Sequence, residues 1–158
     1  MLWTAQPVET HPLLAHLGLE PLSRGLAPAT LYRLTRKQRL TIKQFLMDGR
    51  RIVGVGNIYA SESLFRAGIH PLTPAGRLSR ERCAALSRAI KDTLRSAIRA
   101  GGSSLRDFVG ADGIAGEFQL RTWVYDREGL PCRRCGTPVK RLVLGARATY
   151  FCPTCQKR

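Results

Sequence analysis

The chain has 158 residues, enough for one ordinary domain or two small ones, and 44% of them are hydrophobic, as in folded proteins. Lysine and arginine number 26 against 11 aspartate and glutamate, which gives a formal charge of +15 and an isoelectric point near 10.8. No run of 18 apolar residues is present, and MLWTAQPVET lacks the pattern of a secretion signal, so we expect a cytoplasmic protein without membrane spans.

The positive charge is carried mostly by arginine spread along the whole chain. A field of this sign concentrates polyanions at the protein surface. Basic membrane binders usually carry a lysine-rich amphipathic helix, whereas dispersed arginine suits contacts with phosphates. We therefore expect a nucleic acid as the partner, although composition leaves open a merely soluble basic protein.

Helices are predicted over most of the first hundred residues. Residues 1–27 are the least regular part, and LW could be the end of a strand. PATLYRL begins a short helix at Pro28, and TIKQFLMDG predicts another, with Thr41 as its cap and Gly49 at its end. The connection RRIVGVG leads into NIYASESLFRAG, a helix that Gly68 closes.

The clearest helix spans residues 79–100. Ser79 is a good N-cap, and apolar residues recur every three or four positions after it. Cys83 lies on this apolar stripe, so we interpret it as a packing residue. Gly101 and Gly102 end the helix.

Residues 101–119 hold five glycines. Composition alone slightly favours a flexible linker over a mobile loop that closes over a ligand. The following RTWVYDREG alternates in character like a strand that runs into a turn.

Two C-x-x-C units form the most specific motif, with sixteen residues between the inner cysteines. This spacing is typical of a four-cysteine zinc site, and a redox dithiol pair is the competing interpretation. Because four thiolates fill a tetrahedral Zn²⁺, the ion should be structural. PVKRLVL and RATYF predict a β-hairpin that turns at Gly145 above the metal. The expected ligands are Cys132, Cys135, Cys152 and Cys155.

The connection VGVGNIYASE carries Tyr59 where a dinucleotide-binding fingerprint requires glycine. Asn57 is a good N-cap, and the free N–H groups at a helix start attract an anion. Gly54 and Gly56 would let a phosphate approach the backbone, and Lys43 could reach the same group. Equally open is the interpretation in which Asn57 only caps its helix and the glycines only turn the chain.

Taken together, KQFLMDGRRIVGVGNIYASESLFRAGIHP, the long helix, the glycine-rich loop and CRRCG…RATYFCPTCQ resemble the C-terminal part of bacterial formamidopyrimidine-DNA glycosylase, from about residue 11 onward. The resemblance implies a mainly α fold with a small β zinc ribbon. A helix-two-turns-helix DNA-binding domain would cover residues 28–119, with loop 101–119 over the damaged base. A zinc-finger β-hairpin would cover 120–158, and residues 1–27 would be a remnant of the N-terminal domain and linker.

The resemblance also implies a set of DNA contacts. In that family, the residues matching Lys43, Asn57 and Arg147 bind DNA phosphates around the flipped-out lesion. The equivalent of Arg147 is also the proton donor of the final elimination. A further contact lies just before the first helix of the motif, where Gln38 replaces the usual basic residue between two basic neighbours. The expected DNA-binding set is Lys37, Gln38, Arg39, Lys43, Gly54, Gly56, Asn57 and Arg147.

The catalytic groups of the family are not matched. Its chemistry starts at an N-terminal proline followed by a glutamate, with a lysine from a hairpin of the same domain, whereas here Met1 is followed by Leu2 and Trp3. Nucleophilic catalysis needs the amine, its acid/base partner and the target carbon held together. Lys43 could in principle form a Schiff base, but nothing in the sequence indicates a lowered pKa. We therefore expect this chain alone to bind damaged duplex DNA without excising the base.

Three functions remain in view. The first is the DNA-binding half of a DNA repair glycosylase/AP lyase for oxidised purines of the formamidopyrimidine and 8-oxoguanine type. The second is a stand-alone duplex DNA-binding zinc protein, and the third is an RNA-binding zinc ribbon, which the helix-two-turns-helix match disfavours. We expect a monomer that holds one structural Zn²⁺, binds damaged or abasic double-stranded DNA and works at the bacterial nucleoid.

Overall fold

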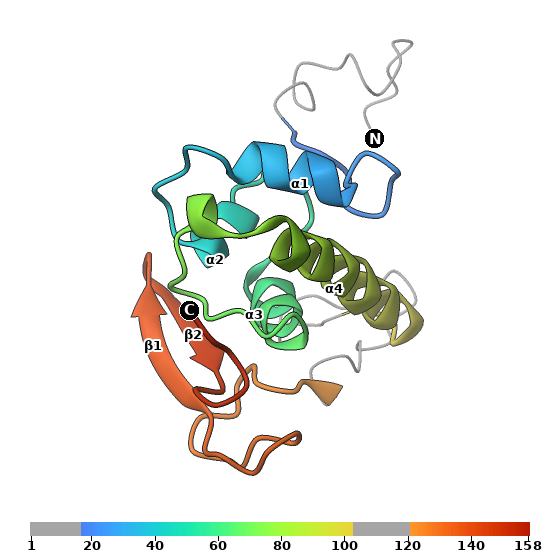
Figure 1. The fold of residues 1–158 in the computed structure, drawn as a ribbon. Helices are drawn as coiled ribbons and strands as arrows, with labels where there is room; N and C mark the ends of the chain where they lie inside the picture. Colours follow the sequence, from blue (N-terminus) through green and yellow to red (C-terminus); the bar gives the residue numbers. More distant parts are fainter. Residues whose placement is uncertain (1–16, 103–120) are drawn as a thin grey trace.

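A computed structural model describes residues 17–102 and 121–158 of the chain (Figure 1). The elements in chain order are α1 (Pro28–Thr35), α2 (Ile42–Leu46), α3 (Asn57–Arg66), the 3-10 turn η2 (Ala75–Arg77), α4 (Arg80–Arg99), β1 (Lys140–Leu144) and β2 (Arg147–Phe151). This confirms the predicted fold class, a helical domain followed by a small β-hairpin. The expectations for Leu2, Trp3 and loop residues 103–119 lie outside the described residues. Within the described ranges, no helix is long and apolar enough to cross a membrane.

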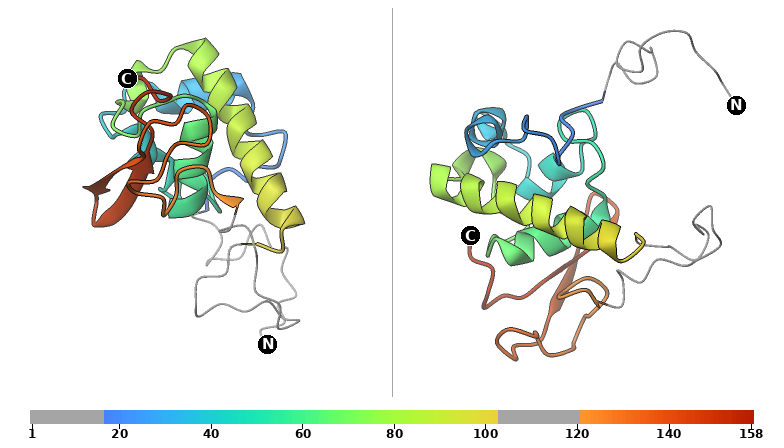
Figure 2. Two further views of the ribbon diagram at one scale, coloured as in Figure 1. Left: turned by 90° about the horizontal axis from the view of Figure 1, so that it is seen from below. Right: turned by 90° about the vertical axis from the view of Figure 1, so that its right-hand side faces the viewer.

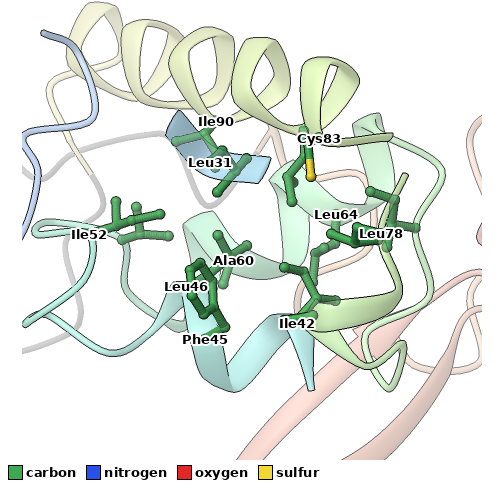
Figure 3. Close-up of a cluster of buried hydrophobic side chains, with 14 of the residues drawn as sticks. Leu31, Ile42, Phe45, Leu46, Ile52, Ala60, Leu64, Leu78, Cys83 and Ile90 are labelled. Carbon is green, nitrogen blue, oxygen red and sulfur yellow. The ribbon is translucent and has the colours of Figure 1, made fainter. Parts of the chain in front are cut away.

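The main hydrophobic core lies between the helices. The long helix α4 packs against α1 and α3, and buried side chains such as Leu31, Phe45, Leu64 and Ile90 bring all four helices together (Figure 3). Cys83 belongs to this core and is fully buried, which confirms its interpretation as a packing residue.

Two side-chain caps fix where helices begin. The Thr41 hydroxyl accepts a hydrogen bond from the backbone of Gln44, whose side chain accepts one from Thr41 N–H, so α2 starts with a complete capping box. The Ser79 hydroxyl caps α4 in the predicted way by accepting from Arg82 N–H. Helix α2 is shorter than predicted because it ends at Leu46, before Gly49.

The β-hairpin pairs β1 and β2 in antiparallel register, from Lys140 opposite Phe151 to Leu144 opposite Arg147. The turn falls at the predicted Gly145, whose φ of 56° favours glycine. The strand predicted for RTWVYDREG is wrong, since residues 121–129 form turns and bends. The backbone N–H groups of residues 123–125 are hydrogen-bonded to one carboxylate, which leaves them unable to donate to a neighbouring strand.

Helix α3 lies between α4 and the hairpin (Figures 1 and 2). A second, smaller core forms where Phe65 of α3 meets Val124, Cys132 and Val139, and the Phe65 ring stacks on Trp123 at 5.7 Å. Beyond the helix, Gln156 donates a side-chain hydrogen bond to the Ile69 carbonyl. The hairpin is thus docked on the helical domain through α3 and the segment that follows it.

Candidate nucleic-acid interface and metal centre

The four predicted ligands converge at the base of the hairpin. The sulfur atoms of Cys132, Cys135, Cys152 and Cys155 all lie within 4.8 Å of one another. The Cys132–Cys155 and Cys135–Cys152 pairs are separated by 4.0 and 3.5 Å. Zn–S bonds of about 2.3 Å in a tetrahedron require sulfur atoms roughly 3.8 Å apart, so these four residues fit Zn²⁺.

The local backbone also prepares the cysteines for a metal. The Arg134 N–H donates to Cys132 Sγ and the Cys155 N–H donates to Cys152 Sγ, each at 3.4 Å. Such bonds stabilise negative charge on sulfur. Burial and hydrogen bonds with the neighbouring thiols raise the pKa of Cys155 to about 12. Four thiolates this close together therefore require the charge of a bound cation.

Lys43 and Asn57 meet at a single carbonyl group of the hairpin. Lys43 Nζ donates to the Ala148 carbonyl at 3.1 Å, and Asn57 Nδ2 donates to the same oxygen at 3.0 Å. Lys43 Nζ also donates to Thr149 Oγ1 at 2.6 Å. Arg147 directly precedes Ala148 and is exposed at the start of β2. The structure therefore brings together the three residues on which the predicted phosphate contacts depend.

Lys43 lies in a buried environment that the sequence does not indicate. Its side chain is buried, with 1% exposed, and among the described ion pairs none includes it. Burial, reinforced by the positive charge of Arg147, lowers the pKa of Lys43 to about 8. Nothing in the sequence indicates this lowered pKa, because the sequence does not show that a lysine in α2 is covered by a strand more than a hundred residues later.

Asn57 is not the N-cap of its helix. Gly56 occupies that position and Asn57 is the first residue of α3. Its amide nitrogen is committed to Ala148, and its Oδ1 is buried without a hydrogen-bond partner within the described residues. Gly54 needs the left-handed region, at φ 78°, whereas Gly56 has an ordinary φ of −80°. A Cβ atom added at either glycine would meet nothing within 4 Å, so the loop is open beside both residues.

The basic run before α2 consists of Lys37, Gln38 and Arg39. Lys37 and Arg39 are exposed, and the backbone of Gln38 is held by bonds with Thr35 and Gly76. In the described part of the chain, no hydrogen bond or ion pair joins these residues to Lys43, Asn57 or Arg147. Their role in DNA binding stays a prediction.

Glu62 has a structural role next to the site, and the sequence analysis did not identify it. It is fully buried in α3, and its carboxylate accepts backbone hydrogen bonds from Trp123, Val124 and Tyr125 at 2.9 to 3.0 Å. It thereby ties α3, which begins at Asn57, to the segment that leads into the ribbon. The sequence does carry one sign that Glu62 is buried: the other residues from 58 to 65 of its helix are mostly apolar or small.

Residues 17–109, more than half of the chain, match the family model of the formamidopyrimidine-DNA glycosylase H2TH (helix-two-turns-helix) domain. The chain belongs to the formamidopyrimidine-DNA glycosylase family. Residues 129–158 match the model of a zinc finger found in this glycosylase, abbreviated FPG, and in IleRS. This match and the four-sulfur cluster together indicate one structural zinc ion.

Curated members of the formamidopyrimidine-DNA glycosylase family are similar over the whole chain. The formamidopyrimidine-DNA glycosylase of Aromatoleum aromaticum is 61% identical over 158 residues, which are 100% of this chain and 58% of the relative. That of Paraburkholderia phytofirmans is 58% identical over 160 residues, covering 99% of this chain and 58% of the relative. The chain therefore spans little more than half the length of these relatives.

Solved structures of the family have the same fold. The MutM (Fpg) protein of Thermus thermophilus superimposes with a TM-score of 0.85 at 47% identity, over 92% of this chain and 56% of that one. Lactococcus lactis Fpg in complex with DNA containing an abasic site superimposes with a TM-score of 0.83 at 33% identity, over 92% and 54%. The predicted family and its DNA-binding and zinc-finger domains are confirmed.

Proposed function

We propose that this chain is the DNA-binding part of a DNA glycosylase/AP lyase that removes oxidised purines of the formamidopyrimidine and 8-oxoguanine type. The meeting of Lys43 and Asn57 at the Ala148 carbonyl, directly beside Arg147, supports this function most strongly. Solved relatives are complexes with DNA that contains an abasic site or Fapy-dG, which supports the same class of ligand. We also propose that the protein is a monomer and that it acts at the nucleoid in the bacterial cytoplasm.

The cluster suits a backbone phosphate. Arg147 presents an exposed guanidinium that can form paired hydrogen bonds with phosphate oxygens. Lys43 adds a positive charge that no described ion pair neutralises. The start of α3 adds N–H groups and the positive end of the helix dipole. Gly54 and Gly56 leave the adjoining loop open, and Lys37, Gln38 and Arg39 extend the proposed contact surface before α2.

The zinc ion has a structural part in this function. The ligands lie at one end of the hairpin and Arg147 lies beside the turn at the other end. When bound, the ion supplies folding free energy and leaves no ligand position for a substrate. The ribbon then holds Arg147 beside the Ala148 carbonyl, to which Lys43 and Asn57 are hydrogen-bonded. We propose Arg147 as the proton donor of the elimination step when the catalytic groups of the family are supplied.

We further propose that this chain alone binds damaged or abasic duplex DNA without excising a base. Lys43 is the amine with a lowered pKa, but its side chain is 1% exposed and packed under β2. Nucleophilic attack requires contact between the amine and a sugar carbon, which this covering prevents. The positive charge of Lys43 can still attract a nearby phosphate, because an electrostatic interaction acts through space.

Borohydride trapping on abasic-site duplex DNA tests this proposal. The 158-residue chain should bind the duplex in a gel-shift assay and form no covalent adduct, while a full-length relative forms one under the same conditions. An adduct formed by this chain would contradict the binding-only function. Repeating the reaction with Lys43→Met would then show whether Lys43 is the nucleophile.

A stand-alone duplex DNA-binding zinc protein is the second candidate. The proposed contacts of Lys43, Asn57 and Arg147 are with phosphates and not with base edges. Such contacts favour this alternative over any sequence-specific DNA-binding protein. Competition between intact and abasic duplexes distinguishes the two functions. A preference of about tenfold or more for the abasic duplex supports the repair function, and equal affinity supports the stand-alone protein.

A further inference from the structure

A hollow of about 450 Å³ lies where η2 and the start of α4 meet the last residue of the chain. Its wall is formed by Leu72, Thr73, Pro74, Arg77, Arg82 and Arg158. Half of these residues are arginines, and they come from three separate places in the sequence. None of them belongs to the Lys43, Asn57 and Arg147 cluster.

None of the three guanidinium groups of this hollow forms an ion pair within the described residues. Arg77, Arg82 and Arg158 take part in none of the ion pairs found there. Arg82 Nη2 donates to the Lys157 carbonyl at 2.7 Å, which fixes its guanidinium beside the end of the chain. Burial lowers the pKa of Arg82, so its charged form is disfavoured by its surroundings and would be favoured by a nearby anion.

Thr73 adds an unused hydrogen-bonding group to the wall. Thr73 is 3% exposed, and its Oγ1 is buried with no hydrogen-bond partner among the described residues. The backbone of Thr73 is held in place because its carbonyl accepts from Ile42 N–H and its N–H donates to the His70 carbonyl. A buried hydroxyl without a partner costs free energy. The Thr73 hydroxyl is covered in this structure, so turning it toward an acceptor bound in the hollow would offset that cost.

We propose that this hollow binds one oxyanion of the phosphate class, held by Arg77, Arg82 and Arg158 with the Thr73 hydroxyl as a further donor. Guanidinium groups pair with two phosphate oxygens at once, and three of them balance a doubly charged phosphate better than a single carboxylate. The size of the hollow leaves room for a substituent on the phosphate, such as a sugar or a second phosphate.

The phosphate has two possible sources. Ile42 N–H bonds the Thr73 carbonyl at 2.7 Å, so the wall is attached to α2, the helix that carries Lys43. A duplex bound at Lys43 could therefore place a backbone phosphate in the hollow. The other source is a free phosphate or a nucleotide. The proposed site stands without the proposed DNA function, because binding of inorganic phosphate is measured with no DNA present.

Titration calorimetry with inorganic phosphate tests the site. Arg77→Gln should weaken phosphate binding about tenfold, and Thr73→Val about threefold or more, since each removes a donor to the anion. The matched control Arg24→Gln removes an exposed arginine elsewhere and should leave binding unchanged. The melting temperature of Thr73→Val should not fall, because the hydroxyl has no partner to lose among the described residues. Unchanged phosphate binding in both Arg77→Gln and Thr73→Val would overturn the proposal, as would an equal loss in Arg24→Gln.

The salt dependence of DNA binding then assigns the source. If a DNA phosphate occupies the hollow, Arg77→Gln makes the slope of log K against log salt shallower by about 0.9, and Arg24→Gln does not. If a free anion occupies it, Arg77→Gln loses phosphate binding and keeps the wild-type slope. Both results support the anion site, which only the two calorimetric outcomes named above contradict.

Discussion

Lys43 in α2 donates a 2.6 Å hydrogen bond from Nζ to Oγ1 of Thr149 in β2, a residue 106 positions later in the chain. Both residues are buried, with 1% and 0% exposed, so the bond is shielded from water. Polar groups buried in this way are stabilised only while both partners are present. The bond is thus one of the contacts that hold the hairpin on the helical domain, together with the Asn57 bond to Ala148 and the core around Phe65.

Removing the acceptor of this bond should destabilise the protein. Thr149→Val keeps the shape of the side chain and leaves Lys43 with one fewer partner, so we expect a loss of about 1–3 kcal/mol in the free energy of unfolding. Thr149→Ser keeps the hydroxyl and should lose much less. Urea unfolding of the two variants measures the difference, and equal losses would show that the methyl group of Thr149 matters as much as its hydroxyl, which would contradict the role of the bond.

The lowered pKa of Lys43 predicts a pH dependence of DNA binding. A phosphate favours the protonated amine, so affinity should fall as the pH rises through about 8, by up to about tenfold between pH 7 and 9. The contribution of Lys43 to folding stability should change in the opposite direction. Between about pH 8 and the usual 10.5 the unfolded chain binds the extra proton, so this contribution rises with pH in that window.

Lys43→Met provides the control for the pH experiment. The variant should bind abasic-site DNA more weakly at about pH 7 and show no decrease between about pH 7 and 9, as measured by fluorescence anisotropy. A decrease of the same size in the variant would assign the pH dependence to another group.

Glu62 predicts a large and specific loss of stability. Glu62→Ala leaves three buried N–H groups without an acceptor, which should cost about 3 kcal/mol or more. Glu62→Gln keeps an oxygen for Val124 and Tyr125 and loses the bond from Trp123, so its cost should be clearly smaller. Urea unfolding of both variants measures this. Equal stability of the two variants would contradict the role of the carboxylate as the shared acceptor.

Removal of zinc should unfold the ribbon and leave most of the helical domain. The ribbon packs around a small core that it shares with Phe65 of α3, whereas the helices share a larger core of their own. A chelator should therefore change Trp123 fluorescence in a Trp3→Phe background and leave most of the far-UV helical signal. Native protein should hold one zinc ion per chain, and Cys132→Ser should hold less. A ratio well below one in native material would contradict the zinc site.

The sequence was sufficient for features whose cause is local. The cap at Thr41, the cap at Ser79, the turn at Gly145 and the cysteine spacing each depend on residues within a few positions, or on a motif with a fixed geometry. These predictions are confirmed. The boundary between the helical domain and the ribbon near residue 119 stays a prediction, because residues 103–120 lie outside the described part of the chain.

The features that sequence reasoning missed depend on distant contacts. Asn57 was expected to cap α3, but its amide bonds Ala148, 91 positions later. The strand predicted after residue 120 does not form because Glu62 binds three consecutive N–H groups there. The lowered pKa of Lys43 requires knowing that β2 covers it. No local pattern in one sequence reports such pairings.

The salt dependence of binding to abasic-site duplex DNA tests most directly the claim that Lys43, Asn57 and Arg147 bind backbone phosphates. If about five phosphates are neutralised, log K should fall against log salt with a slope of about −4 to −5, and Arg147→Gln should make the slope shallower by about 0.9. A nearly flat salt dependence, or an unchanged slope in Arg147→Gln, would contradict the claim.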